Sequence, residues 1–450
     1  MMNKVYIFLL VAISMPALAQ HKTRSAGDKN HIAARGILPN LSDSALLDEV
    51  QRQTFRYFWD FAHPVSGMAR ERSNAAYGYG SEVVTTGGTG FGIMATVVAV
   101  NRGWITRDSA ARHLLKMVRF LEKADAYHGA FAHWLNGSTG KTIPFSRKDD
   151  GADLVETSFL FQGLLTARQY FDRTNATETE LRNRINGLYR GIEWSWFTRG
   201  GEEVLYWHWS PNNGWSMNFP VKGYNECLIM YVLAAGSNSY PVSDAVYHKG
   251  WVQSNFFRND RGFYGIRLLL GFDYGGPLFF AHYSFLGLSP VGLEDAYANY
   301  WEQNQNHTLI NRAYCMDNPR HFKGYGSNCW GLSASDNHQG YSAHSPTNDL
   351  GVITPTAALS SFPYTPEYSM QVLRHLYYDL GDKLWSEYGF KDAFNETENW
   401  VAKSHLAIDQ GPIIVMIENY RSKLIWDLFM SSPEVKYGLQ KLGFNSPYFK

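Results

Sequence analysis

Apolar residues recur at three- and four-residue intervals along most of this chain, which is the spacing of one face of an α-helix. In residues 43–61, Leu46, Val50 and Phe58 fall on one such face, and Ser42 stands where it can cap the first turn. The dominant element predicted by this pattern is therefore the amphipathic or buried helix.

The same spacing predicts helices over residues 43–61, 90–102, 107–123, 153–171, 177–197, 224–236, 242–251, 293–313, 366–380, 411–428 and 434–442, with a weaker case at 355–362. Strand-like segments are short and lie at 202–209, 262–272 and 278–283. Two long stretches, 252–292 and 315–355, lack helical periodicity, and loops of such length within a compact domain are usually functional.

The predicted helices are of two kinds. Those near 158–171 and 225–235 are apolar on most faces, whereas those near 107–123 and 177–195 carry Arg, Lys or Glu on one side. Buried helices alternating with amphipathic ones are typical of an inner and an outer ring. We therefore predict an all-α protein, an (α/α)6 barrel with short β-hairpins and long loops at its active-site end.

Composition favours one large domain over several small ones. Charged residues make up only 18% of the chain and aromatic residues 15%, so much of the chain must be interior or face a ligand. The formal net charge is zero and the basic residues are dispersed, which gives no reason to expect binding to nucleic acid or to an anionic membrane. We expect a single catalytic domain over residues 41–450 and a monomer.

The N-terminus has the pattern of a secretory leader. Lys4 precedes an apolar run from Val5 to Ile13, and Ala17 and Ala19 form a small-residue cleavage site. We predict a signal peptide over residues 1–19 and a flexible lead-in over 20–40. No cysteine follows the cleavage site to carry a lipid anchor, so the expected location is periplasmic or secreted.

The three cysteines leave two alternatives open. Cys315 and Cys329 are close enough in sequence to pair in an oxidising compartment, or both can remain thiols. Cys227 lies in an apolar helical stretch and is expected to be a buried free thiol.

An acidic cluster precedes the buried helix at 153–171. If that helix begins near Asp150, then Asp149, Asp153 and Glu156 fall on one face at its N-terminal end. Helix capping by Asp150 or Asp153 is the simplest explanation, but a cap needs only one acid. Three acids together favour a role such as binding sugar hydroxyls.

Two further acids occupy similar positions. Glu226 opens an apolar helix directly after a Trp-rich loop, where a water-poor cleft would raise its pKa toward that of a general acid. Asp409 stands just before an apolar helix that has Pro412 in its first turn. Helix-start capping remains an alternative for both. Asp392 and Glu418 are weaker candidates, since each lies where an exposed charge is ordinary.

Aromatic residues near these acids could stack on pyranose rings, and about half of them are expected to line a cleft: Trp134, Trp207, Trp209, Trp215, Tyr224, Tyr283 and Trp330. Other chemistries have less support. No His-Glu-x-x-His or tight His/Cys pair indicates a metal, and no Gly-x-Ser-x-Gly motif is present. The glycines of "GGTGFG" at 87–92 have the wrong spacing for a dinucleotide fingerprint and are interpreted as a loop entering a helix.

Five ordered motifs resemble the glycoamylase-like proteins of glycoside hydrolase family 144: "LLDEVQRQTFRYFWDFAHPVSGMARERS", "TTGGTGFGIMA", "DLVETSFLFQGLL", "KGYNECLIMYVLA" and "IDQGPIIVMIENYRS". The resemblance covers essentially all of residues 41–448. It implies an (α/α)6 barrel, an inverting mechanism, and cleavage of β-1,2-glucan to sophorose and short sophoro-oligosaccharides. Such hydrolysis requires only carboxyl groups and water, so no cofactor is expected, and the absence of metal-binding motifs gives no reason to expect a metal.

The family's acidic positions fall on Asp149, Asp153, Glu156, Glu226 and Asp409 by that resemblance. We assign Glu226 as general acid and Asp409 as general base, with Glu156 as the next candidate and Asp149 and Asp153 as ligands of sugar hydroxyls. The leading hypothesis is an exported endo-β-1,2-glucanase. An exo-acting enzyme that releases sophorose, an α-glucan hydrolase and a non-catalytic glycan-binding protein remain alternatives.

Overall fold

The structure is a computed structural model that describes residues 31–74 and 80–449. The predicted signal peptide and residues 20–30 of the predicted lead-in lie outside the described residues. Within the described ranges, no helix has both the length and the apolar character that crossing a membrane requires.

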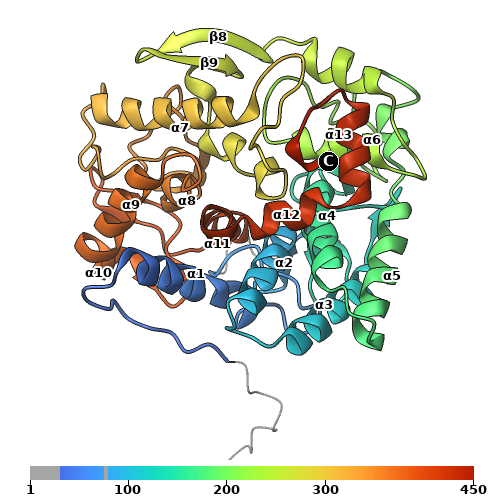
Figure 1. Ribbon diagram of the computed structural model, residues 1–450, viewed down its shortest axis with the longest axis horizontal. Helices are drawn as coiled ribbons and strands as arrows, with labels where there is room; N and C mark the ends of the chain where they lie inside the picture. Colours follow the sequence, from blue (N-terminus) through green and yellow to red (C-terminus); the bar gives the residue numbers. More distant parts are fainter. Residues whose placement is uncertain (1–30, 75–79, 450) are drawn as a thin grey trace, which may run out of the picture.

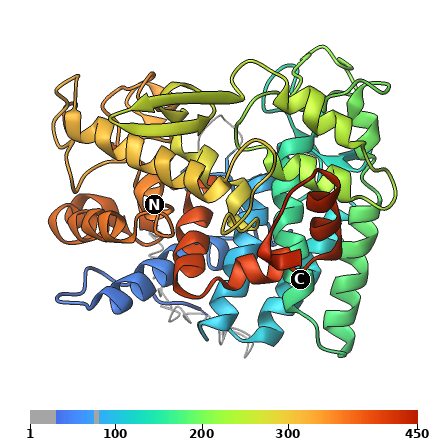
Figure 2. The same ribbon diagram turned by 45° about the horizontal axis from the view of Figure 1, so that its top comes forward.

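Helices surround a common centre in two rings (Figure 1). The inner helices are buried on nearly every face: α2 (Thr86–Asn101), α4 (Leu154–Tyr170), α6 (Leu228–Gly236), α8 (Pro355–Leu359) and α11 (Ala407–Ser422). The outer ones bury one face: α1 (Asp43–Trp59), α3 (Arg107–Leu121), α5 (Ala176–Arg190), α7 (Tyr300–Asp317), α9 (Pro366–Arg374) and α13 (Pro433–Lys441). These two rings form the all-α helical barrel that the sequence predicts, and Figure 2 shows the same rings tilted.

Several helix boundaries differ from the prediction. The helix expected at 411–428 begins earlier, at Ala407, and continues after a break at Lys423 as α12 (Leu424–Met430). The segments expected at 242–251 and 366–380 contain π-helical turns, η2 (Val246–Val252) and η6 (His375–Asp379), the latter followed by α10 (Gly381–Leu384). The helix expected at 177–197 ends at Arg190 and is followed by a 3-10 turn, η1 (Trp194–Thr198).

Helices α2 and α4 contact each other backbone to backbone. A Cβ atom on Gly90 would lie 2.0 Å from the carbonyl oxygen of Phe159, and one on Gly163 would lie 2.1 Å from the carbonyl oxygen of Gly90. The prediction that "GGTGFG" is a loop is therefore wrong. These glycines form the first turns of α2, because only residues without side chains allow so close an approach.

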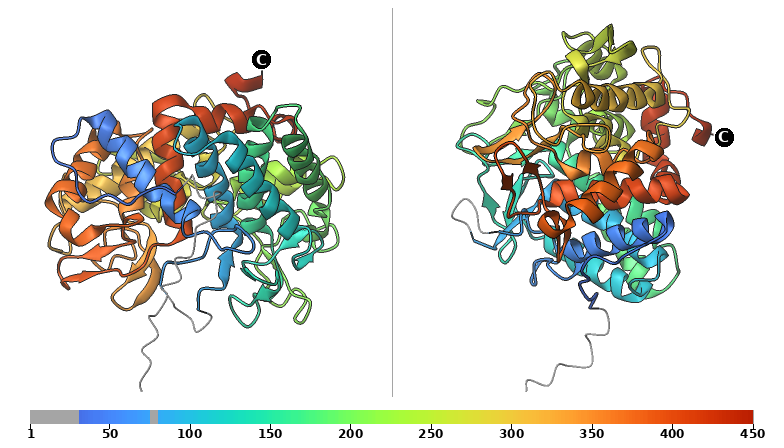
Figure 3. Two further views of the ribbon diagram at one scale, coloured as in Figure 1. Left: turned by 90° about the horizontal axis from the view of Figure 1, so that it is seen from below. Right: turned by 90° about the vertical axis from the view of Figure 1, so that its left-hand side faces the viewer.

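The strands are short and antiparallel: β1 (Val83–Thr85) with β4 (Trp134–Asn136), β4 with β5 (Thr142–Ile143), β2 (Ala126–Tyr127) with β3 (Ala130–Phe131), β6 (Ala152–Asp153) with β7 (His208–Trp209), β8 (Arg258–Phe263) with β9 (Ile266–Leu270), β10 (Ala334–Asn337) with β11 (Gly340–Ala343), β12 (Trp385–Ser386) with β13 (Gly389–Phe390), and β14 (Phe394–Asn395) with β15 (Trp400–Val401). In the left panel of Figure 3, the blue and orange strands lie at the end of the molecule away from the C-terminus.

The strand predicted at 278–283 is wrong. It forms the 3-10 turn η4 (Leu278–Ala281), followed by η5 (Ser284–Leu286); a third turn, η3 (Asp273–Gly275), precedes them. The helical turn brings the rings of Phe279 and Tyr283 together, with their centroids 4.8 Å apart. Four-residue spacing of aromatic residues, rather than alternation, was the signal in this stretch.

Ordered contacts begin before Leu41, where the sequence predicts them to start. The Ile32 side chain is buried. The Arg35 guanidinium lies 2.9 Å from the carboxylate of Glu49, and the Leu38 N–H donates to the hydroxyl of Tyr377 at 2.9 Å. Residues 32–38 of the predicted flexible lead-in therefore pack against α1 and η6.

All three cysteines are buried and free. This confirms the expectation for Cys227. Of the two alternatives for Cys315 and Cys329, the structure shows the one in which both remain thiols.

Candidate active site

One cavity of about 190 Å³ is bordered by two of the predicted acids, Glu156 and Glu226, and by three of the predicted aromatic residues, Trp134, Trp207 and Tyr283. Its wall includes residues at or near the starts of four inner helices: Thr85 directly precedes α2, Glu156 lies in the first turn of α4, Glu226 lies two residues before α6, and Leu406 directly precedes α11. The positive ends of these helix dipoles therefore meet around one space, which favours negative charge there. The lining residues are Glu71, Arg72, Thr85, His133, Trp134, Phe145, Glu156, Phe159, Trp207, Glu226, Phe279, Tyr283, Ala334, Tyr341, Leu406 and Ile408.

Glu156 is held by the start of α2. The N–H of Gly87 donates to Oε2 of Glu156 at 2.8 Å, and a Cβ on Gly87 would lie 2.4 Å from that oxygen. Burial raises the pKa of Glu156 to about 7, since the hydrogen bond and the nearby His133 only partly offset the loss of hydration. The carboxyl group therefore exchanges its proton near neutral pH.

Glu226 has a comparable environment on the facing element. Its side chain is buried to 9% exposure and borders the cavity. Burial raises its pKa to about 7, with smaller contributions from the carboxylates of Glu156 and Asp153. A carboxyl group that is neutral below pH 7 and faces a cavity has the properties of a general acid.

Asp149 and Asp153 are brought together by two histidines rather than by a shared helix face. The helix begins at Leu154, so the predicted spacing on one helical face is wrong. Asp153 is the N-cap of α4 and accepts from the N–H of Glu156 at 2.9 Å. It therefore has the capping role considered above, and its other oxygen faces the histidines.

The histidines are His133 and His208. His133 Nδ1 lies 3.2 Å from Oδ2 of Asp153 and 3.8 Å from that of Asp149, whereas His208 Nε2 lies 3.5 Å and 3.2 Å from the same two atoms. Burial opposes the charged imidazoles, but nearby carboxylates raise the pKa of His133 to about 9 and that of His208 to about 10. The histidines in turn hold the pKa of Asp153 well below its usual range, despite its burial.

Sequence reasoning missed these histidines, because no local pattern connects them to the acids. His208 lies in β7 and pairs in register with Asp153 in β6, but the two residues are far apart in sequence. His133, Asp149 and Asp153 also place possible metal-ligand atoms within 4.8 Å of one another. In this structure the His133 ring nitrogen instead pairs with the two carboxylates.

Asp409 lies within the first turn of α11, not before the helix as predicted. Both of its carboxylate oxygens are buried, and the carboxyl group lies within hydrogen-bonding reach of Asp392 and the Tyr283 hydroxyl. Its neighbours Ile408 and Tyr283 border the cavity, whereas Asp409 itself lies behind that wall. Burial, together with the neighbouring Asp392, raises the pKa of Asp409 well above its usual range.

Asp392 is a second residue that the sequence undervalued. It is 2% exposed, not an ordinary surface charge, and the N–H of Asp336 donates to its Oδ2 at 2.7 Å. Burial and the charge of Asp336 raise its pKa to about 7. Arg72, on the cavity wall, pairs with Asp336 at 2.9 Å and with Glu71 at 2.8 Å. A group of buried acidic residues thus lies behind the cavity wall on the side of α11.

Glu418, the other weak candidate, is fully buried and pairs with Arg102 at 2.8 Å. It lies near the far end of α11 from Asp409, and its contacts are structural.

The aromatic candidates divide into three groups. Trp134, Trp207 and Tyr283 border the cavity, as predicted. Trp209 and Trp215 lie outside it and pack around Trp196. The remaining two, Tyr224 and Trp330, do not border the cavity and are buried in the core at 1% and 0% exposure.

Comparison with known proteins identifies the family of this site. The Glycoamylase family model, described as "Putative glucoamylase", matches residues 218–433. An endo-β-1,2-glucanase from Chitinophaga pinensis, solved with sophorotriose and glucose, is 56% identical, with a TM-score of 0.89, and the match covers 91% of this chain and 100% of that one. The chain belongs to the glycoamylase-like family, glycoside hydrolase family 144.

Two other members of the family are informative. A solved structure from Bacteroides uniformis is 62% identical over 92% of this chain and 100% of that chain, with a TM-score of 0.90. An exo-β-1,2-glucooligosaccharide sophorohydrolase from Parabacteroides distasonis is 46% identical over 89% of this chain. The present chain spans 58% of the length of that relative.

Proposed function

We propose that this protein is an exported, inverting glycoside hydrolase that cleaves β-1,2-glucan to sophorose and short sophoro-oligosaccharides. The observation that carries this proposal is the cavity on whose wall Glu156 and Glu226, each with a pKa near 7, stand beside aromatic residues. Full-length similarity to an endo-β-1,2-glucanase supports the substrate class. Export rests on the N-terminal sequence pattern described above.

Glu226 acts as the general acid in this proposal. Its raised pKa keeps it protonated at slightly acidic pH, so it can deliver a proton to the departing glycosidic oxygen. Trp134, Trp207 and Tyr283 on the same wall offer ring faces to glucose units. Asp149 and Asp153 do not border the cavity themselves, so they act through His133, which lines the cavity and pairs with both carboxylates.

Two carboxyl groups compete for the role of general base. Asp409 shares its buried site with Asp392, and burial raises the pKa of both carboxyl groups, so the two can share a proton. Asp409 acts as the base when that proton resides on Asp392. Glu156 borders the cavity directly and is the alternative. The reaction requires only carboxyl groups and water, so the proposal includes no cofactor.

Endo action is our leading proposal, because the endo-acting relative has the higher identity and is matched over its entire length. The exo-acting relative makes release of sophorose from a chain end the second candidate. An exo enzyme must close one end of its cleft. The long segments at 252–292 and 315–355 are the candidates for closing it, so they would have this role in an exo enzyme and not in an endo enzyme.

The deciding experiment is a time course of purified protein with linear β-1,2-glucan, starch and laminarin, with products separated by chromatography. The expected result is a ladder of sophoro-oligosaccharides from β-1,2-glucan alone. Sophorose alone from the first minutes indicates exo action, and products from starch contradict the substrate assignment. Proton NMR of the first product tests inversion, which yields the α-anomer from a β-linkage.

The variant Glu226→Gln tests whether the protein is an enzyme or a non-catalytic glycan-binding protein. If the wild-type protein binds β-1,2-glucan without turnover and E226Q binds equally well, the protein is a binder and the catalytic proposal fails. Asp409→Asn and Glu156→Gln then distinguish the two candidate bases. Substrates whose leaving group needs no protonation do not require the general acid, so E226Q is expected to hydrolyse them still. Whichever of D409N and E156Q lacks the general base is expected to lose this hydrolysis.

A further inference from the structure

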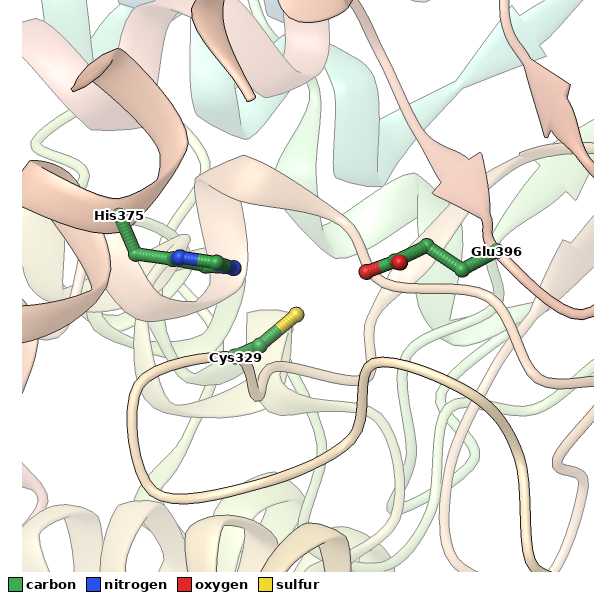
Figure 4. A group of neighbouring side chains, drawn as sticks. All are labelled: Cys329, His375 and Glu396. Carbon is green, nitrogen blue, oxygen red and sulfur yellow. The ribbon is translucent and has the colours of Figure 1, made fainter. Parts of the chain in front are cut away.

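Three side chains with metal-ligating atoms meet outside the candidate active site. Cys329, His375 and Glu396 place one thiol sulfur, one ring nitrogen and one carboxylate oxygen within 4.8 Å of one another. Figure 4 shows the imidazole and the carboxylate pointing toward each other, with the sulfur directed between them. None of the three borders the cavity described above.

The three residues belong to separate segments. Cys329 ends a tight turn in which the N–H of Gly326 donates to the Cys329 carbonyl at 3.0 Å. His375 is the first residue of η6, and Glu396 directly follows β14. The chain near Gly324 lies so close to the β14 hairpin that a Cβ there would be 2.2 Å from Oε1 of Glu396. The segment that leads to Cys329 is thus packed closely against the Glu396 side chain.

His375 is oriented for ligation. Its Nδ1 lies 2.8 Å from Oδ2 of Asp379, one helical turn further along η6. A carboxylate on one ring nitrogen fixes the tautomer and leaves the other nitrogen, Nε2, as the donor of an electron pair. Carboxylate–histidine pairs of this kind are the usual support of histidine ligands in zinc sites.

Charge at the cluster favours a cation. The Glu396 carboxylate forms no salt bridge with any lysine or arginine in residues 31–74 or 80–449. Burial raises the pKa of the Cys329 thiol to about 12, so its proton leaves only when a cation binds. A thiolate, a neutral imidazole and a carboxylate then carry two negative charges, which a divalent ion neutralises. Sulfur, nitrogen and oxygen ligands in one site are typical of zinc.

We propose that Cys329, His375 and Glu396 form a zinc site, with water as the fourth ligand. Binding forms a bond from the ion to the Cys329 sulfur and releases the thiol proton to solvent. Ligand atoms within 4.8 Å need only small movements to reach zinc bonds of about 2.0 to 2.3 Å. The ion would fasten the turn at Cys329, helix η6 and the β14 hairpin to one another.

The test is metal analysis of the full-length protein purified without chelator and then dialysed against zinc chloride. We expect one equivalent of zinc per chain and a higher Tm than for the EDTA-treated protein. Replacing zinc with Co²⁺ is expected to give the tetrahedral visible bands and a thiolate-to-metal charge-transfer band, which directly reports sulfur ligation in the unmutated protein. Cys329→Ser and His375→Ala are expected to abolish both signals, and Asp379→Asn to weaken zinc binding about tenfold.

Cys315→Ser is the matched control, since Cys315 is also a buried free thiol but does not belong to the cluster. It should bind zinc as the wild type does. The proposal is overturned if the protein takes up no zinc, if the Co²⁺ spectrum lacks the sulfur band, or if C329S binds zinc normally. Mass spectrometry showing a Cys315–Cys329 disulfide in the zinc-treated protein would also refute it.

Discussion

At the scale of one residue, burial changes the pKa of the Glu226 carboxyl group and thereby its acid–base chemistry. Its carboxyl group is 9% exposed, and its pKa of about 7 lies well above the ordinary value of 4.5. The folded protein therefore holds a proton that the unfolded chain releases. Between pH 4.5 and 7 the native state binds more protons than the unfolded state, so stability from this group falls as the pH rises.

Glu226→Gln tests both consequences. Activity is expected to fall at least about 100-fold, because the proton donor is lost. The free energy of unfolding at pH 8.5 is expected to rise by up to about 3 kcal/mol over the wild type, with no gain at pH 4, because glutamine removes a buried charge. Denaturant unfolding at the two pH values measures the difference.

Glu203→Gln is the control for this variant, since Glu203 is half exposed and pairs with Lys249 at the surface. It should change stability by less than about 0.5 kcal/mol at either pH. Equal stability of E226Q and the wild type at pH 8.5 would show that Glu226 ionises without cost, and would contradict its assignment as a proton donor near neutral pH.

Asp153 combines a helix cap with the charge that holds two imidazolium groups. Asn caps a helix about as well as Asp, so Asp153→Asn preserves the cap and removes only the charge. We expect roughly 3 kcal/mol lower stability at pH 7, because His133 and His208 lose a buried partner. Chemical denaturation measures this loss.

The sign of the pH dependence gives a second readout. The stability contributed by His133 and His208 is complete below pH 6.5 and is lost as the pH rises through about 9 and 10. In D153N this loss should become smaller, and NMR titration should show lower pKa values for both histidines. Unchanged histidine pKa values would mean that Asp149 alone maintains their charge.

At the scale of elements, the short distance between inner helices α2 and α4 depends on glycines. A Cβ on Gly90 would collide with the backbone of α4 at 2.0 Å. This contact also sets the position of Glu156, which receives the Gly87 N–H from α2. Helix packing and the protonation of an active-site carboxyl group are therefore linked.

Gly90→Ala is expected to destabilise the protein by about 3 kcal/mol, because the two helices must separate to admit a methyl group. Gly187→Ala is the matched control. It lies on the exposed face of α5, where an added Cβ meets nothing within 4 Å, so stability should stay equal or rise by up to about 1 kcal/mol. Thermal unfolding compares the two, and similar Tm values would refute the close-contact argument.

At the scale of the whole molecule, the segment before α1 secures the outer ring. Ile32 is buried, Arg35 pairs with the buried Glu49, and the Arg35 carbonyl accepts from Gln53 and Trp385. These contacts connect the first helix to the region after α9, which closes the ring. None of these residues borders the cavity.

A chain that begins at residue 41 is expected to lose at least about 2 kcal/mol of stability compared with one that begins at residue 31. Its kcat should be unchanged at temperatures where both are folded, because the truncated segment does not reach the cavity. Parallel calorimetry and glucan hydrolysis assays measure the two effects. Equal Tm values would show that residues 31–40 contribute nothing to ring closure.

The sequence by itself determined the helical rings and the identity of most of the acids. Helical periodicity and the contrast between apolar and amphipathic segments depend on near neighbours in the chain, so α1, α3 and α4 were predicted within two residues of their observed bounds. Glu156 and Glu226 were found because a charge beside an apolar helix start is a local pattern.

Only the tertiary structure decided how those acids are balanced and paired. His208 reaches Asp153 through the pairing of β6 and β7, and Asp392 reaches Asp409 from a separate loop. Glycines of α2 are helical because α4 lies against them, which overrides their weak helix propensity. Tyr224 and Trp330 are core residues because segments distant in sequence cover them, and the local sequence pattern does not reveal such contacts.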